Sequence, residues 1–335
     1  MQYINKTNIF SLLLGSALLG TGGGIPLKAH KKIYESAFRE KQNIALRNVN
    51  EFQPGHYLAT VYMVGDPSKV RTNLKDTLTA ALDDYQKMTG IRIRGIIPGE
   101  IGAEGIAFQA SAYANLPVAD SDLVGGRAAP EISMDVFSIY QIPLTPIFAV
   151  SLQGNSMLLS GAISGHEIEE TTRNFFKKNG GVGLLIGYPV KAGAYKKIAM
   201  RGTISLAIKI GNYLATADIE GLLKKFSGSV IAKRTITRVN LKSGGDFFSG
   251  YLHLQEFKLW VKNENIELFK KDKKIAAAPD IIALLQSNGT PIHNSEIGGM
   301  RGKEVVIVTL PAFGYWKQKK NKALWKSALS PARSV

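Results

Sequence analysis

The sequence contains no cysteine. This absence excludes an intrachain disulfide, a thiolate metal site and a cysteine nucleophile. It also fits a reducing compartment, so we expect a cytoplasmic protein. Acidic residues are in the minority, with 26 Asp and Glu against 42 Lys and Arg, which gives a formal net charge of +16. The lysines are spread along the chain without a nucleic-acid-binding motif, so we predict no specific nucleic-acid partner.

Long apolar runs are lacking as well. The best candidate, residues 9–19, is too short for a bilayer, which takes about 20 residues. Only one basic residue, Lys6, precedes this run, and no convincing cleavage site follows it. We therefore expect a buried helix here, and no membrane span. The remaining composition, 45% apolar and 20% charged over 335 residues, is that of a folded protein with two domains.

In the first half of the chain, helical and extended patterns alternate. Apolar residues recur at helical spacing in four segments, and five short runs have the β-branched and aromatic content of strands. The predicted helices cover residues 9–19, a stretch after Pro26, 73–88 and 103–115, and the predicted strands cover 57–65, 91–97, 117–120, 134–140 and 146–152. This alternation predicts an α/β domain over residues 1–160 with a parallel or mixed sheet.

The second half changes character. Residues 158–178 and 192–214 have helical patterns, and from residue 227 onward most runs are typical of strands, with one short helix predicted over 279–285. We therefore predict an α+β, β-rich domain over residues 161–335 that ends in a basic, tryptophan-containing tail.

Four glycines occur within the five residues GTGGG, directly before the helix that begins near Pro26. Such a loop could cradle an anion, because glycine lets the backbone approach a ligand and a helix start offers free N–H groups. It is neither a P-loop nor a dinucleotide fingerprint, since no Gly-Lys-Ser/Thr follows and a helix precedes it. A tight turn between two helices is the structural alternative. The candidate ligand contacts are Thr21, Gly22, Gly23 and Gly24.

Carboxylates gather in the glycine-rich stretch between residues 96 and 131. Glu100 follows the strand predicted over 91–97, and Asp120 and Asp122 end the next strand. Ligands of open α/β sheets bind at the carboxyl ends of strands. Burying ionised carboxylates costs several kcal/mol each unless they are paired, coordinated or protonated. We therefore predict a site here, with Arg127 and Glu131 as orienting groups.

These carboxylates could act as a base or bind a divalent metal. Capping of turns by Asp120 or Asp122, and pairing of Arg127 with Glu131, is the structural alternative. Histidine adds little, because the five in the chain have no metal-binding spacing. His166, beside acids in SGHEIEE, is the best histidine candidate for a ligand. Whether a metal binds stays open; if one does, Asp120, Asp122 and His166 are the candidate ligands.

A series of motifs resembles one known family. In order along the chain they are LGTGGG at 19–24, PGEIGAEG at 98–105, LPVADSDLVGGRAAPEISM at 116–134, RGTISLAIKIG at 201–211, NENI at 263–266, PDIIALL at 279–285 and VTLPA at 308–312. Together they resemble the S-methyl-thiohydantoin desulfurase-like family, which is associated with hydantoinase and oxoprolinase genes. The chain departs from that pattern after residue 65, where Lys69 and Arg71 stand in place of an acidic residue. The departure suggests a different substrate specificity.

The resemblance implies a two-domain hydrolase or desulfurase that acts on a hydantoin-like small molecule with carboxylate- or metal-activated water. Glu100, Asp120, Asp122 and Glu131 are then the catalytic candidates. A non-catalytic accessory subunit of a hydantoinase-type system is the alternative, and a homo-oligomer is also conceivable. One geometric prediction follows. The glycine loop, Glu100 and the two aspartates should line one cleft roofed by the second domain, and at least one of these acids should have a raised pKa.

Overall fold

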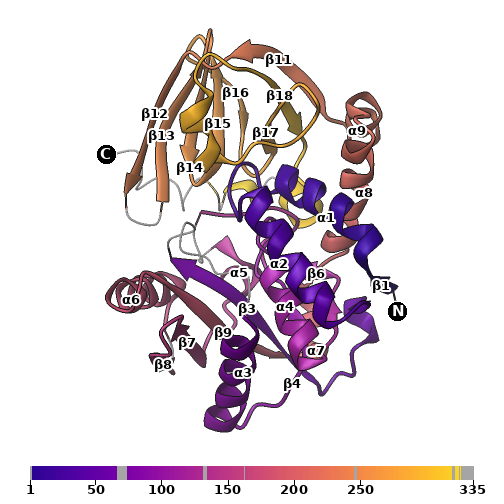
Figure 1. The fold of residues 1–335 in the computed structure, drawn as a ribbon, viewed down its shortest axis with the longest axis vertical. Coiled ribbons are helices and arrows are strands. Elements are labelled where there is room, and N and C mark those ends of the chain that lie inside the picture. Colours follow the sequence, from indigo (N-terminus) through magenta and orange to yellow (C-terminus); the bar gives the residue numbers. More distant parts are fainter. Residues whose placement is uncertain are drawn as a thin grey trace.

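An eight-stranded mixed sheet organises the lower part of the molecule (Figure 1). The computed structural model describes residues 2–65, 74–130, 134–161, 163–244, 247–318, 321–323 and 325. In spatial order its strands are β1 (Gln2–Ile4), β2 (Ile44–Arg47), β5 (Val118–Ala119), β4 (Ile93–Ile97), β3 (Tyr57–Gly65), β9 (Val182–Lys191), β7 (Ile147–Ser151) and β8 (Ser156–Leu159). The four neighbouring strands β2, β5, β4 and β3 are parallel to one another, and all other neighbouring pairs are antiparallel.

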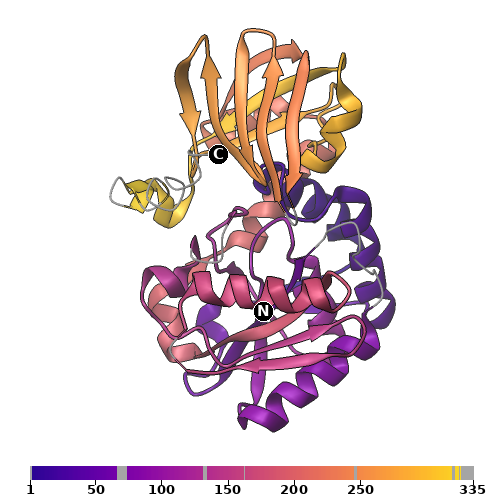
Figure 2. The same ribbon diagram turned by 90° about the vertical axis from the view of Figure 1, so that its left-hand side faces the viewer.

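Helices cover both faces of this sheet. One face packs on α3 (Lys75–Thr89) and α4 (Gly105–Ala114), with α2 (Leu27–Glu40) outside α4. The other face carries α5 (Val136–Ile139), α6 (Gly165–Lys178) and α7 (Ala192–Ile198). Figure 2 shows α6 lying across the front of the sheet. These are the apolar faces expected of helices in a layered α/β domain.

Three further helices join the sheet domain to the rest of the chain. Helix α1 (Lys6–Leu19) packs along α8 (Thr203–Ala215), and α9 (Ile219–Phe226) follows α8. Helix α1 is buried in a core that also contains strand residues of the upper domain. The apolar run near the N-terminus is thus a core helix, as predicted. Within the described residues, no helix combines the length and apolar character needed to cross a membrane.

Glycines let α1 and α8 cross at very short range. A Cβ atom added at Gly15 would lie 1.8 Å from the Ala207 carbonyl oxygen, and one added at Gly211 would lie 1.6 Å from the Ser11 carbonyl oxygen. A side chain at either position must push the backbones apart. The crossing therefore depends on glycine at both positions.

We expect Gly211→Ala to lower the free energy of unfolding by about 1–3 kcal/mol, the usual cost of overpacking a tight core. Chemical denaturation of the wild-type protein and of Gly211→Ala measures this difference in unfolding free energy. Gly299→Ala is the matched control, because a Cβ there meets nothing within 4 Å. Equal stability of the two variants would contradict the close crossing.

The upper domain is built from two antiparallel sheets. The first has the order β11 (Ser229–Thr235), β18 (Glu304–Leu310), β17 (Ile281–Leu285), and the second runs in sequence through β12 (Arg238–Gly244), β13 (Phe247–Leu254), β14 (Phe257–Lys262), β15 (Glu264–Lys270) and β16 (Lys273–Ala277). Apolar residues of both sheets share one core. A short ribbon of β6 (Ser121–Asp122) and β10 (Met200–Arg201) lies apart from them. The predicted pairing of an α/β domain with a β-rich domain is confirmed.

Two local predictions were wrong, and one strand was missed. Residues 134–140 were expected to form a strand, but Asp135 accepts a 2.8 Å hydrogen bond from the Ser138 N–H and begins helix α5 instead. Residues 279–285 were expected to be helical, but β17 is a fully buried strand paired with β18. Strand β9 was not predicted, because Gly183, Gly187 and Pro189 interrupt its apolar run.

Strand β9 lies between β3 and β7, so the eight-stranded sheet draws on residues from both sides of residue 160. The division of the chain at residue 160 stays a prediction of the sequence.

Candidate functional site

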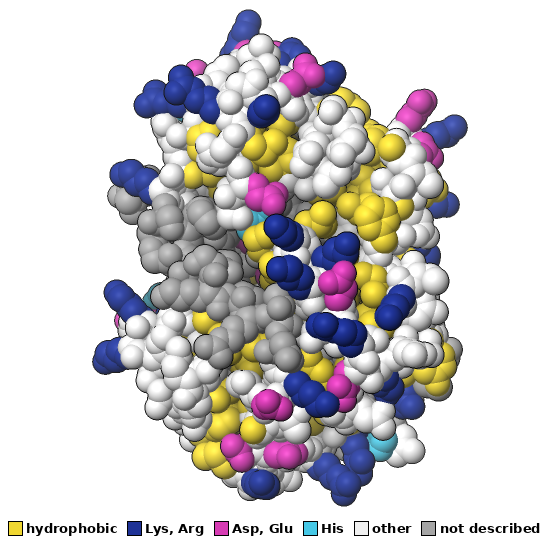
Figure 3. Space-filling model, in the orientation of Figure 1, with side chains coloured by type: hydrophobic (Ala, Val, Ile, Leu, Met, Phe, Trp, Pro, Cys, Tyr) yellow, Lys and Arg dark blue, Asp and Glu magenta, His cyan; other side chains and the backbone are white. Residues whose placement is uncertain are grey.

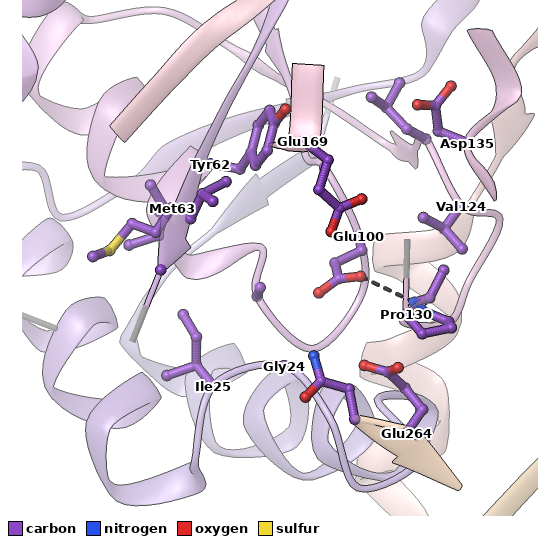
Figure 4. Close-up of a pocket in the computed structure, with 18 of the residues that line it drawn as sticks. Gly24, Ile25, Tyr62, Met63, Glu100, Val124, Pro130, Asp135, Glu169 and Glu264 are labelled. Atoms are coloured by element: carbon purple, nitrogen blue, oxygen red, sulfur yellow. Dashed lines mark hydrogen bonds between the residues drawn. The ribbon is translucent and has the colours of Figure 1, made fainter. Parts of the chain in front are cut away.

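A cavity of about 190 Å³ lies where the carboxyl ends of β3 and β4 meet the turn between β14 and β15 (Figure 4). Both domains line it, because the upper domain contributes Asn263 and Glu264 from that turn. The volume is below the roughly 300–1,000 Å³ of drug-sized sites, so it suits a small ring. From the lower domain, the lining includes Gly24, Ile25, Tyr62, Gly99, Glu100, Val124, Ala129, Asp135, Glu169, Arg173 and Tyr188.

Glu100 stands in this cavity at the end of β4, as the sequence predicted. Its Oε2 accepts a hydrogen bond from the Ala129 N–H at 3.1 Å. The pKa of Glu100 is raised to about 8, chiefly by burial and also by the nearby carboxylates of Asp122 and Glu104, against the opposing effects of the Ala129 hydrogen bond and Arg127. Near neutral pH, this carboxyl is therefore poised between its acid and base forms.

Glu264 faces the same cavity from the upper domain. The residue is only 1% exposed, and among the described residues its Oε2 has no hydrogen-bond partner. Burial raises the pKa of Glu264 well above its ordinary value, the charge on Glu100 acts in the same direction, and Arg127 acts in the opposite direction. A buried polar oxygen without a partner costs free energy unless a ligand or water satisfies it. Glu264 thus presents an unused acidic group to the cavity.

The glycine loop closes around this carboxyl. A Cβ atom added at Gly23 would lie 2.0 Å from Glu264 Oε1, and one added at Gly24 would lie 2.5 Å from the Gly102 carbonyl oxygen. Gly24 lines the cavity. Gly22 packs against the Asn294 side chain, where a Cβ would come within 2.6 Å of Nδ2. The loop is therefore both a tight turn between α1 and α2 and one wall of the cavity.

Arg127 is buried behind the cavity wall, with 1% of the residue exposed. Its guanidinium donates to the carbonyl oxygens of Ala128 at 2.9 Å and Asp280 at 3.3 Å, and to Thr21 Oγ1 at 3.4 Å. It stacks over the Trp325 ring at 4.1 Å. Burial lowers the pKa of Arg127 to about 10, although the surrounding carboxylates act in the opposite direction. Thr21 and Arg127 are thus brought together beside the loop, and neither lines the cavity.

The two aspartates lie outside the cavity lining. Asp120 accepts hydrogen bonds from the Ser205 N–H at 3.0 Å and from the Ser205 hydroxyl at 2.6 Å, at the start of α8. Asp122 is fully buried and accepts three backbone N–H groups of the turn that follows it, at 2.8–3.0 Å. Burial raises the pKa of Asp122 to about 7. The single-cleft prediction is therefore right for Gly24 and Glu100 and wrong for the aspartates.

Within the described residues, the candidate metal ligands Asp120, Asp122 and His166 form no group that could hold a metal ion. His166 is exposed on α6, and in the described part of the chain no group of three or more His, Asp or Glu side chains could hold a metal ion. Glu131 and the basic segment at residues 66–73 lie outside the described residues. The catalytic roles of Asp120, Asp122 and Glu131 stay predictions.

Sequence reasoning missed several acids of the cavity. Glu264 lies in the NENI motif, where Asn263 and Asn265 flank it, and its place between two runs rich in apolar strand residues was the available signal. Asp135, which caps α5, likewise interrupts an apolar run, and burial raises its pKa to about 7. On α6, Glu169 pairs with Arg173 at 2.8 Å. Figure 4 shows Glu100, Glu169 and Glu264 facing the same space.

Two family models match the chain, one for the S-Me-THD-like N-terminal domain over residues 7–161 and one for the S-Me-THD-like C-terminal domain over residues 163–326. The chain belongs to the S-Me-THD-like family. The family predicted from the motifs is thereby confirmed.

The fold also matches a crystal structure of a protein from Chromobacterium violaceum, solved by the Northeast Structural Genomics Consortium. The two chains are 19% identical, with a TM-score of 0.82, and the match covers 99% of this chain and 97% of the other. At this identity the match shows a shared fold. A comparison with curated proteins found no match.

Proposed function

We propose that the protein hydrolyses a small hydantoin-like ring, with release of a methylthio group from an S-methyl-thiohydantoin as the main candidate reaction. Family membership supports the substrate class. The cavity supports the chemistry, because Glu100 and Glu264 face it from different domains and burial raises the pKa of both. Two such carboxyls can divide the roles of base and acid when their environments differ. The observation that carries the proposal is the buried, unpartnered oxygen of Glu264 in the cavity that Glu100 lines.

In the attack step, the ionised Glu100 accepts a proton from water as the water oxygen bonds to the ring carbon. Glu264 gives its proton to the adjacent ring nitrogen, which makes that carbon more electrophilic. In the collapse step the roles reverse. Glu264 takes the proton of the new hydroxyl as the carbonyl forms, and Glu100 protonates the departing sulfur as the carbon–sulfur bond breaks. The products are the hydantoin and methanethiol, and both carboxyls regain their starting protonation.

The reaction should depend on pH through Glu100. Because its pKa is raised to about 8 and the base is the ionised form, kcat/KM should rise with pH through about 8. At higher pH, ionisation of Glu264 should lower the rate again. The pH profile of methanethiol release measures both effects. A profile that stays flat between about pH 6 and 9 would contradict the assignment of Glu100 as the base.

The substrate assay uses a panel of S-methyl-thiohydantoins, unsubstituted hydantoins and other cyclic amides, with and without added divalent metal. Methanethiol is detected with a thiol reagent, and ring opening by chromatography. We expect turnover of at least one S-methyl-thiohydantoin and its loss in Glu100→Gln. Absence of turnover across the panel would favour a non-catalytic accessory subunit of a hydantoinase-type system.

A further inference from the structure

A second and larger cavity lies on another side of the lower domain. It is an open groove of about 960 Å³ between the α7–α8 segment, the end of α9 and residues 313–315. The turn after Asp122 separates it from the first cavity, since Val124 lines the first cavity and Gly125 lines the groove. The groove is therefore separate from the first cavity.

The charged side chains that line the groove are all positively charged. Four cationic side chains line it, and none of its described lining residues is Asp or Glu; the four are Lys197, Arg201, Lys209 and Lys225. On the face shown in Figure 3, lysines and arginines are interspersed with Asp and Glu. The groove thus favours an anion.

Aromatic rings line the same groove. Phe226 lies between Tyr213 and Phe313 and packs edge-to-face on both rings. Its ring centroid is 6.3 Å from that of Tyr213 and 6.1 Å from that of Phe313. Tyr140 and Tyr315 form a second pair at 5.9 Å, and Tyr140 is 46% exposed. Partly exposed rings of this kind offer faces on which a planar ligand group can stack.

We propose that this groove binds an organic polyanion that carries a planar ring, the chemistry of a nucleoside diphosphate. Lysine and arginine bind phosphate oxygens through charge-assisted hydrogen bonds, and exposed rings stack on a base. The volume lies within the roughly 300–1,000 Å³ of small-molecule sites. This inference goes beyond the proposed hydrolysis, because it concerns a different cavity and is tested by ligand binding rather than by catalysis.

Two adjacent lysines allow a matched test. Lys224 and Lys225 both lie in the last turn of α9, but only Lys225 lines the groove. We expect ADP to bind the full-length protein in isothermal titration calorimetry at low salt. Lys225→Glu should weaken ADP binding at least about tenfold, whereas Lys224→Glu should change it by less than about twofold. Circular dichroism of both variants controls for folding.

The ring contribution is tested with adenosine, pyrophosphate and the variant Tyr213→Leu. ADP should bind more tightly than either fragment, and Tyr213→Leu should weaken ADP binding while leaving pyrophosphate binding unchanged.

The proposal is overturned by any of three results: no ADP binding, equal losses in Lys224→Glu and Lys225→Glu, or pyrophosphate binding as tightly as ADP. Preference for single-stranded DNA over ADP at equal phosphate concentration would also overturn it, in favour of a nucleic-acid surface.

Discussion

Glu264→Gln is expected to lower kcat/KM by about 10²- to 10⁴-fold, the range typical of lost general acid catalysis. Glutamine keeps the shape of the carboxyl but cannot supply its proton. Burial raises the pKa of Glu264 and so favours its neutral form, and the neutral amide should therefore leave the unfolding free energy near neutral pH unchanged or raise it. Steady-state kinetics and chemical denaturation of the same preparations separate the two effects.

Glu267→Gln provides the control on the same strand. Glu267 lies outside the cavity lining and pairs with Lys274 at 2.9 Å, so its loss should leave kcat/KM within about twofold. Full activity of Glu264→Gln would remove this residue from the proposed mechanism. A large loss of stability in that variant would instead indicate that the carboxyl is ionised in the folded protein.

Gly23→Ala should lower activity by an amount comparable to that of Glu264→Gln, because the added methyl group displaces the Glu264 side chain. The added Cβ would lie 2.0 Å from Glu264 Oε1 and 2.9 Å from its Cγ, so the carboxyl must leave its place. Gly23 is not among the residues with a positive φ, so alanine adds no backbone strain there. We expect kcat/KM to fall about 10²-fold or more.

A double-mutant cycle tests whether the two residues act together. If Gly23→Ala acts by moving Glu264, the double variant Gly23→Ala/Glu264→Gln should be about as active as Glu264→Gln alone. Gly55→Ala is the control, because a Cβ there meets nothing within 4 Å. Multiplicative losses in the double variant would show that the glycine acts independently of Glu264.

The sequence predicted the elements whose pattern is long and periodic. Helices α1, α2 and α3 and strand β3 carry enough apolar residues at one spacing to be identified. The errors fell on short apolar runs. Residues 281–285 fit a buried helix or a buried strand equally well, and only the pairing of β17 with β18 decides between them. That pairing is a tertiary contact and leaves no local mark in the sequence.

Some residues of the candidate site could also be predicted from local sequence patterns, and others could not. Glu100 and Gly24 were predicted to meet because strand ends and helix starts of one sheet gather at one edge, and both line the cavity. Asp120 and Asp122 have the same sequence signature, but neighbouring N–H groups satisfy them. Glu264 was missed because a turn of the other domain delivers it, more than a hundred residues along the chain. Contacts between domains are what local patterns cannot supply.

The position of β9 has a consequence for synthesis on the ribosome. When residues 1–161 have emerged, β3 and β7 each have an open edge where β9 will pair, and these edges are made of apolar residues. Unpaired apolar edges invite association with other chains. The eight-stranded sheet therefore cannot be completed until about thirty further residues have left the exit tunnel, and the open edges favour aggregation during that interval.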